Sequence, residues 1–236
     1  MKSVTLLVLS LNEYEGIKAI MPNIDRTLFC QIIFLDGGST DGTIELINEM
    51  GFEIYIQKKK GIRNGYKEIW PLIRGDYVLT FSPDGNSPVD SLPRLINKIN
   101  EGYDMVIGSR YLPPAKSYDD DPITAFGNWL FTNTVNILFR RAKYTDVMVL
   151  LRVFRTNLIE ELELNTEKPF NLVEKIYSTK ISFEPLLSVR VAKYGKRVTE
   201  IPADEPERIG GVRKLQILRW GAAYYTQFFL ERFNLL

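Results

Sequence analysis

The sequence predicts an α/β protein with a mostly parallel central sheet, helices on both faces of that sheet, and amphipathic helices toward the C-terminus. Two observations lead to this fold class. Over the first 110 residues, short β-rich runs alternate with longer segments whose apolar residues recur at helical spacing. This β–α alternation is typical of a parallel sheet with crossover helices. After residue 110 the alternation ends, and two long amphipathic segments follow, 122–139 and 212–233.

The individual elements follow from local patterns. Ser39 and Asp41 are start signals for a helix that carries Leu46 and Ile47 at helical spacing and ends at Gly51. The expected strands are 4–10, 31–36, 52–56, 76–81, 104–109, a buried strand at 145–154 and a short one at 196–202; the other expected helices lie within 13–24, 61–73, 89–102, 122–139, 182–195 and 212–233.

Composition limits the class of protein. The chain has 236 residues, of which 45% are hydrophobic and 25% charged, as expected for one globular domain with a substantial core. We find no internal repeat and no low-complexity linker, so residues 1–236 are interpreted as a single domain. The net charge of +1 gives no overall field that would attract nucleic acid, and nucleic acid is not an expected partner.

Two residue types are nearly or wholly absent. The chain has no histidine and one cysteine, Cys30, which excludes Ser-His and Cys-His catalysis as well as zinc sites. Any metal would be a hard cation bound by oxygen ligands. We expect Cys30 to be a small buried residue in a reducing, cytoplasmic protein. The N-terminus does not resemble a secretion signal, and no run reaches the ~20 apolar residues of a spanning helix.

Acidic and small residues follow three of the expected strands. They are "SLNEYE" after the first, "LDGGSTDGT" after the second and "FSPDGNSP" after the fourth. Ligands of open α/β sheets bind at the carboxyl ends of the strands. Asp36 could accept hydrogen bonds from a sugar hydroxyl or a base N–H group, and the two glycines after it allow a ligand close to the backbone. The chain has neither a Walker loop nor a GxGxxG fingerprint.

These motifs resemble those of the family 2 glycosyltransferases with a GT-A fold. The matching stretches are "LSLNEYEG", "FLDGGSTDGT", "GIRNG", "GDYVLTFSPDGN" and "DMVIGSRY". Further on, "YTDVMVLLRVFRTNL" and "EIPADEPERIGGVRKL" resemble later motifs of polyprenyl-phosphate sugar transferases of the dolichol-phosphate mannose synthase type, so the resemblance covers nearly the whole chain. It implies an inverting transferase with a half that binds a GDP- or UDP-sugar, 1–110, and a half that binds the acceptor, 111–236.

The resemblance also implies roles for individual residues. In that family the turn after the fourth strand reads Asp-x-Asp and holds a divalent cation on the diphosphate. Here Ser82 replaces the first acid and Asp84 is kept. Mg²⁺ or Mn²⁺ is therefore expected on Asp84 and Asn86, although Asp84 also suits a plain turn former. The nucleotide-sugar-binding residues would be Leu9, Ser10, Asn12, Glu13, Asp36, Gly38, Ser39, Arg63, Ser82 and Asp84; the phosphate or acceptor would contact Arg110, Asp146, Arg208, Arg213 and Lys214; Asp84, Arg110 and Glu184 would be catalytic.

The acceptor has two candidate identities. One is a polyprenyl phosphate at the inner face of a membrane, because 122–139 and 212–233 are rich in aromatic residues next to Arg and Lys. The same aromatics equally suit core packing or a homodimer interface. The other is a hydroxyl of a glycan or other alcohol, with Glu184 as the base.

Several departures from the family pattern bear on this choice. Asn128 and Thr132 stand where the lipid-phosphate enzymes usually carry Arg and Ser, and Val149 and Leu150 stand where they carry Ser-Gly. Those departures favour a hydroxyl acceptor, while the Ser82 replacement favours a third reading, a catalytically silent nucleotide-sugar binder. The run 119–121, three consecutive aspartates, suits either acceptor hydroxyls or a solvated loop.

Overall fold

A twisted seven-stranded sheet forms the centre of the protein in the computed structural model, which describes residues 2–209 and 217–236. The strand order is β3-β2-β1-β4-β6-β5-β7. All neighbouring strands are parallel except β6, which is antiparallel to both β4 and β5. The strands are β1 (Val4–Ser10), β2 (Gln31–Asp36), β3 (Glu53–Ile56), β4 (Tyr77–Phe81), β5 (Met105–Ser109), β6 (Arg152–Arg155) and β7 (Val198–Pro202).

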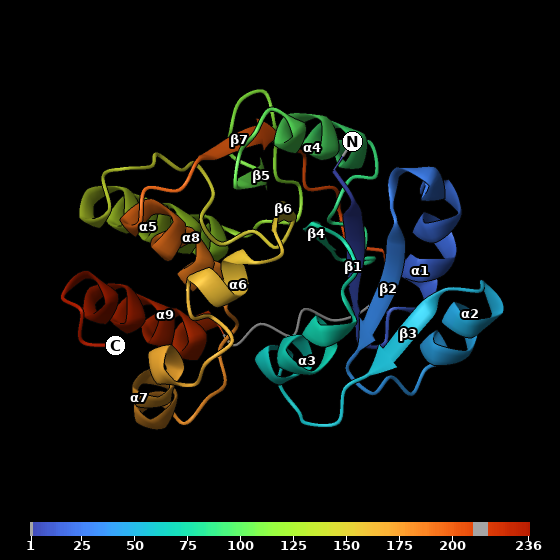
Figure 1. Cartoon of the computed structure of the whole chain (residues 1–236), viewed down its shortest axis with the longest axis horizontal. Coiled ribbons are helices and arrows are strands. Elements are labelled where there is room, and N and C mark those ends of the chain that lie inside the picture. Colours follow the sequence, from blue (N-terminus) through green and yellow to red (C-terminus); the bar gives the residue numbers. More distant parts are fainter. Residues whose placement is uncertain (1, 210–216) are drawn as a thin grey trace.

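Helices cover both faces of this sheet (Figure 1). One face packs against α1, α2 and α4, and the other against α3, α5, α7, α8 and α9. Successive residues of β1 point to opposite sides, so Leu6 and Leu7 belong to different core clusters. The helices are α1 (Tyr14–Ile20), α2 (Thr43–Glu49), α3 (Ile62–Ile69), α4 (Ser91–Asn100), α5 (Pro122–Leu138), α6 (Leu158–Glu161), α7 (Lys168–Tyr177), α8 (Glu184–Lys193) and α9 (Ile217–Arg232). This confirms the predicted α/β class and the mostly parallel sheet.

Two expectations about local structure are wrong. The strand expected at 145–154 begins only at Arg152, because the preceding residues form a loop anchored by hydrogen bonds from Thr145 and Asp146 to Glu200. Cys30 is exposed rather than buried, since it lies in the bend before β2 and its thiol donates to the Val4 carbonyl at 3.3 Å. The sequence patterns also missed α6 and α7.

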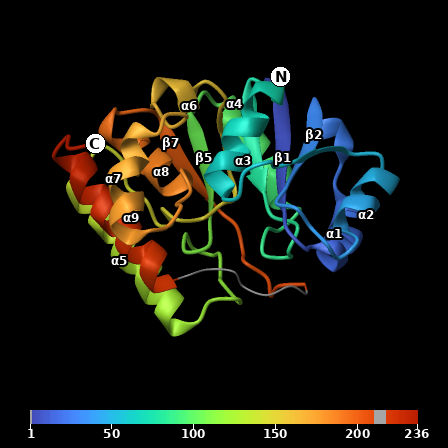
Figure 2. The same cartoon turned by 90° about the horizontal axis from the view of Figure 1, so that it is seen from below.

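Helices α5 and α9 lie side by side at one end of the molecule (Figure 2). The ring of Phe131 on α5 lies 5.8 Å from that of Tyr225 and 5.9 Å from that of Phe228, both on α9. The Thr134 and Tyr225 hydroxyls are 3.0 Å apart. The second half of the protein therefore ends in a paired-helix layer beyond the sheet.

Helix α5 turns its polar stripe inward. Asn128 and Thr132 are each 5% exposed, and the Thr132 hydroxyl accepts a hydrogen bond from the Val147 backbone. Phe126 and Trp129 point outward and are 61% and 60% exposed. A surface helix normally has the opposite arrangement, with its apolar stripe facing the core. Among the residues that the structure describes, we find no helix with the length and hydropathy needed to cross a membrane.

Candidate active site

A cavity of about 820 Å³ lies at the carboxyl ends of β1 and β4 and extends to the space between α5 and α9. The carboxyl ends of the parallel strands lie at this edge of the sheet, which is where open α/β sheets bind their ligands. Of the residues predicted for the site, those that line the cavity are Leu9, Ser10, Glu13, Ser82, Asp84, Asn86, Arg110, Glu184 and Arg208. The lining does not include Asn12, Asp36, Gly38, Ser39, Arg63 or Asp146, and Arg213 and Lys214 lie outside the described residues.

Asp36 is fully buried and organises the loops around it. Its Oδ1 accepts hydrogen bonds from the Gly38 and Ser39 backbone, each at 2.8 Å. Its Oδ2 accepts from the Ser10 hydroxyl at 2.8 Å and from the Ser39 hydroxyl at 2.7 Å. Asn12 continues this network, since its backbone N–H donates to the Ser39 hydroxyl. The structure thus uses Asp36 to hold the loops after β1 and β2, rather than directing it into the cavity as expected.

Arg63 lies elsewhere than the resemblance implied. Its side chain is 1% exposed and makes ion pairs with Glu174 at 2.7 Å and Glu167 at 2.9 Å. The guanidinium also stacks over the Phe170 ring at 4.4 Å. These partners belong to α7 and the residue just before it, so Arg63 joins α3 to α7. A guanidinium held this way is not directed at a nucleotide.

Asp84 lies at the tip of the turn after β4 and is 6% exposed. Its Oδ1 accepts a hydrogen bond from the Asn86 backbone at 3.1 Å, and its Oδ2 lies 2.9 Å from the Arg208 guanidinium. The Ile209 backbone also donates to the Asp84 carbonyl at 2.7 Å. Gly85 has φ of +98°, and a Cβ there would come within 2.9 Å of Ile209. The segment after β7 therefore closes directly on this turn.

The turn offers oxygen ligands for a divalent cation. The Oδ1 atom of Asn86 is shielded from solvent and has no hydrogen-bond partner among the described residues. An orphaned carbonyl oxygen beside a buried carboxylate suits Mg²⁺ or Mn²⁺, and Arg208 already places one positive charge on Asp84. Over the ranges 2–209 and 217–236, no group of three or more acidic, His or Cys side chains is arranged for a metal. Asp84 and Asn86 therefore fit a cation whose remaining ligands come largely from substrate and water.

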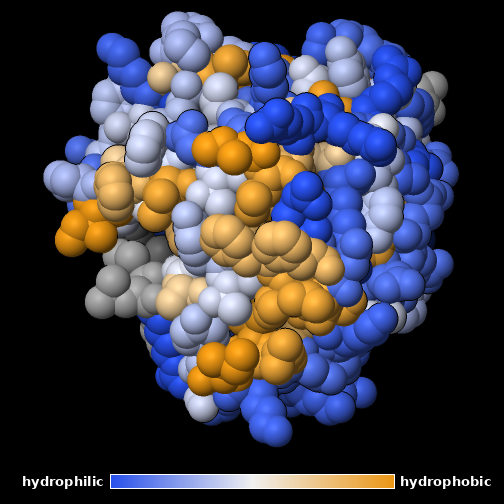
Figure 3. Space-filling model, turned by 90° about the vertical axis from the view of Figure 1, so that its left-hand side faces the viewer, coloured by the Kyte–Doolittle hydropathy of each residue, from blue (hydrophilic) through white to orange (hydrophobic). Residues whose placement is uncertain are grey.

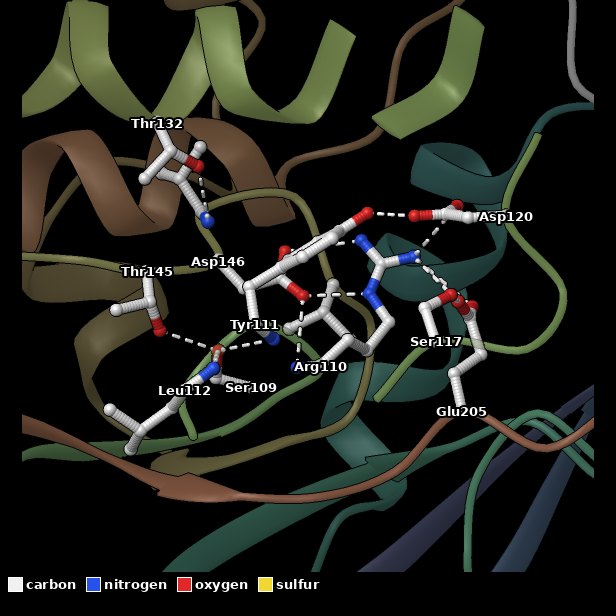
Figure 4. Close-up of polar contacts among 12 residues, drawn as sticks. Ser109, Arg110, Tyr111, Leu112, Ser117, Asp120, Thr132, Thr145, Asp146 and Glu205 are labelled. Carbon is white, nitrogen blue, oxygen red and sulfur yellow. Dashed lines mark hydrogen bonds and ion pairs between the residues drawn. The ribbon is translucent and has the colours of Figure 1, made fainter. Parts of the chain in front are cut away.

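Arg110 lines the cavity and lies among carboxylates (Figure 4). Its Nε donates to Asp146 at 2.7 Å, and its Nη1 lies 3.1 Å from Glu205 and 3.9 Å from Asp120. Burial is the largest single influence and lowers the pKa of Arg110, but the charge and hydrogen bond of Asp146 and the charges of Glu205 and Asp120 together outweigh burial and raise it. Asp146 is fully buried, so its role here is to orient Arg110.

The loop that carries Asp146 is itself held by hydrogen bonds to β7. Glu200 on β7 accepts hydrogen bonds from the backbone of Thr145 at 2.8 Å and of Asp146 at 3.1 Å. Burial raises the pKa of the Glu200 carboxyl. The Thr145 hydroxyl also lies 2.6 Å from that of Ser109, whose oxygen accepts from the backbone of the next loop (Figure 4). This network explains why residues 145–151 do not extend β6.

Glu184 begins α8 and faces the cavity at 4% exposure. Its Oε1 accepts a hydrogen bond from the Tyr66 hydroxyl at 2.5 Å, and its Oε2 accepts from the Ser182 hydroxyl. Burial, with the nearby charge of Glu184, raises the pKa of Tyr66 well above its ordinary value, so Tyr66 stays a donor. Buried Arg152 donates to the Glu184 carbonyl at 3.0 Å. Glu184 is thus held as a hydrogen-bond acceptor at the cavity wall.

The sequence patterns missed other residues of the cavity wall. Lys60 and Lys180 add positive charge, and Asp204 and Glu205 add negative charge. Asp119, one of the three consecutive aspartates already noted in the sequence, lines the same cavity. The run "KKK" that ends at Lys60 was a signal for the first of these, because it follows a strand of the parallel sheet. For Lys180, which follows the unpredicted helix α7, the sequence offered no comparable signal.

Comparisons with known proteins show what this chain is similar to. The family model described as "Glycosyl transferase family 2" matches residues 5–163. A dolichyl-phosphate hexose transferase of Haloferax volcanii is 28% identical over 90% of this chain and 86% of its own length. An undecaprenyl-phosphate mannosyltransferase of Micrococcus luteus is 24% identical over 93% of this chain and 94% of its own length.

A solved structure gives the same picture of the fold. The glucosyl-3-phosphoglycerate synthase of Mycobacterium tuberculosis, crystallised with Mn²⁺, UDP and phosphoglyceric acid, aligns with a TM-score of 0.69 at 16% identity. The alignment covers 98% of this chain and 78% of that one. This likeness confirms the GT-A fold.

Proposed function

Because this chain belongs to glycosyl transferase family 2 and is a glycosyltransferase, we propose that it moves a sugar from a nucleoside-diphosphate sugar to a polyprenyl phosphate at a membrane surface. The donor is a GDP- or UDP-sugar, the anomeric configuration is inverted, and Mg²⁺ or Mn²⁺ assists. The acceptor class is supported by the names of the two relatives. The cation is supported by Asp84, by the orphaned Asn86 oxygen, and by the Mn²⁺ in the similar structure.

The observation that carries this proposal is the continuity of the cavity. One end is polar and holds Asp84 and Arg208, which suits a nucleoside diphosphate. The other end runs between α5 and α9, where Phe131 and Trp220 provide apolar walls. Ile123, which is 66% exposed, also lines the cavity, so this end opens beside the apolar outer face of α5. A lipid phosphate has the matching shape, a charged head on an apolar chain.

The proposed reaction is a single displacement. A phosphate oxygen of the acceptor, already ionised, attacks the anomeric carbon from the side opposite the diphosphate, and the bond to the diphosphate breaks as the new bond forms. Asp84 and Asn86 would hold the cation, which neutralises the charge growing on the leaving group. Arg208, which forms an ion pair with Asp84, would bind the same diphosphate. Arg110, oriented by Asp146, would bind the acceptor phosphate.

We also propose peripheral contact with the membrane through the outer face of α5, which carries the exposed residues Phe126 and Trp129. Figure 3 shows apolar side chains gathered on the end of the molecule that carries α5, α7 and α9. Exposed Arg140 and Arg141 follow α5 directly. Basic residues beside an apolar surface favour anionic lipids, which are abundant in the cytoplasmic leaflet. The expected position is therefore the inner face.

The experiment that tests the proposed function is a transfer assay with the purified chain. Labelled UDP- and GDP-sugars are incubated with a polyprenyl phosphate, with Mn²⁺ or EDTA, and lipid-linked label is extracted. We expect label in the lipid fraction for one donor, and loss of at least about 90% of it with EDTA, because the leaving-group charge is then less neutralised. Nucleotide binding without any transfer to lipid would contradict the proposed acceptor.

A second candidate is transfer to a hydroxyl, with Glu184 as the base. The geometry around Glu184 favours it, because the carboxylate faces the cavity and is oriented by Tyr66 and Ser182. For a hydroxyl acceptor, Glu184→Gln is expected to reduce kcat by at least about 100-fold while nucleotide binding is kept, since a general base typically contributes that much. For a phosphate acceptor, which needs no base, kcat should change less than about tenfold. Assays with lipid-phosphate and glycan acceptors in parallel distinguish the two.

A further inference from the structure

The loop before α5 contains three consecutive aspartates, and two of them have structural tasks. Asp121 caps α5, because its Oδ1 accepts hydrogen bonds from the backbone of Ile123 at 2.8 Å and Thr124 at 3.0 Å. Asp120 accepts a hydrogen bond from the Tyr111 hydroxyl and faces Arg110. Asp119 is different, since it lines the cavity and reaches the turn that carries Asp84.

We propose that Asp119 supplies the second carboxylate of the cation site whose first carboxylate is Asp84. This inference rests on the proposed function, because it concerns the cation of that reaction. Ser82, two residues before Asp84, also lines the cavity but offers no carboxylate. Asp119 comes from the loop between β5 and α5 and would provide the missing charge from a different part of the chain.

Hydrogen bonds join the three side chains into one unit. The Asn86 backbone donates to Asp84 Oδ1 at 3.1 Å, and the Asn86 side-chain nitrogen donates to Asp119 Oδ2 at 2.7 Å. The bond to Asp119 fixes the orientation of the amide, whose Oδ1 is buried and unpaired with respect to every described residue. The unit therefore contains two carboxylates and an unused carbonyl oxygen, which are the ligand types that Mg²⁺ and Mn²⁺ prefer.

The backbone on both sides of Asp119 is anchored. The Tyr118 N–H donates to the Glu205 carbonyl at 2.8 Å, and the Glu205 N–H donates to the Lys116 carbonyl at 2.9 Å. On the other side, Asp121 is tied to the first turn of α5. The backbone is therefore fixed both before and after Asp119. A side chain that binds a metal ion needs such support, because the ligand atoms must keep a defined position.

The balance of charges around Asp84 and Asp119 also supports a cation bound between them. Asp84 and Asp119 contribute two negative charges, and Arg208, 2.9 Å from Asp84, contributes one positive charge. A diphosphate brought to this turn adds further negative charge, and like charges in a partly buried site repel strongly. A divalent cation between the carboxylates and the diphosphate removes that repulsion.

The test measures Mn²⁺ binding directly. The wild-type chain, Asp119→Asn and Asp204→Asn are titrated with Mn²⁺ in the presence of UDP and, separately, of GDP, and free Mn²⁺ is followed by its EPR signal. Asp204 is the matched control, because it lines the same cavity but accepts only from the Lys116 backbone among the contacts described. We expect the Kd for Mn²⁺ to rise at least about tenfold in Asp119→Asn, the effect of a lost charged ligand, and less than about twofold in Asp204→Asn.

A rescue variant separates loss of a ligand from loss of folding. Ser82→Asp combined with Asp119→Asn restores the number of carboxylates and should recover most of the Mn²⁺ affinity. Equal Mn²⁺ affinity in Asp119→Asn and wild type would overturn the proposal, as would equal losses in Asp119→Asn and Asp204→Asn. Nucleotide binding is measured separately, by calorimetry without metal, so that loss of Mn²⁺ binding can be distinguished from loss of the nucleotide site. Wild-type protein that binds nucleotide and transfers sugar but binds no Mn²⁺ would refute the Asp119 assignment and leave the transferase function standing.

Discussion

Replacement of Asp84 by alanine is expected to reduce sugar transfer at least about 100-fold, since a lost electrostatic contact to a leaving group typically costs a few kcal/mol of transition-state stabilisation. The carboxylate is 6% exposed, lines the cavity and is paired with Arg208. Its removal takes away the proposed cation ligand and releases Arg208 from its partner. The measurement is kcat for lipid-linked product at saturating Mn²⁺.

The control for this variant is Asp90→Asn. Asp90 is exposed, precedes α4 and makes no side-chain capping bond, so its carboxylate is close in sequence and unconnected to the cavity. We expect its transfer rate to stay within about twofold of wild type, as for most surface substitutions. Thermal unfolding of both variants shows whether the fold is kept. Near-normal turnover in Asp84→Ala would exclude Asp84 as a cation ligand.

The second large effect is expected at the membrane. Phe126→Glu with Trp129→Glu should weaken binding to vesicles that contain anionic lipid at least about 100-fold, because burial of each aromatic side chain in the lipid is worth roughly 1.5–3 kcal/mol. Both residues are at least 60% exposed on α5, and Figure 3 shows the apolar surface of that end. Co-sedimentation with vesicles of increasing anionic content measures the change.

Leu72→Glu is the matched control for the membrane variant. Leu72 is also an exposed apolar residue, at 46%, but it follows α3 and lies away from α5. Vesicle binding should be unchanged in this control. If the double variant binds vesicles like wild type but changes the molecular mass measured by light scattering, the outer face of α5 is a dimer interface instead. The homodimer expected as an alternative use of these aromatics stays a prediction until that measurement.

The first half of the protein was largely predictable because its signals are local. Each early strand is a run of apolar, β-branched residues that ends in a polar turn, and the structure reproduces 4–10 and 31–36 as β1 and β2. The same reasoning failed at 145–154, because an apolar run can equally line a cavity as a loop. Helix α7 was missed although Phe170 and Val173 face the core at helical spacing.

The sequence by itself determined the α/β class, the position of Asp84 at a strand end and the polar stripe of α5, since each depends on residues a few positions apart. Only the tertiary structure decided that this stripe faces inward, that Arg63 binds Glu174 and that Asn86 contacts Asp119. These contacts join side chains 111 and 33 residues apart in the sequence. The physical reason is that periodicity encodes the direction of a side chain relative to its own helix or strand, whereas its partner depends on how distant elements pack.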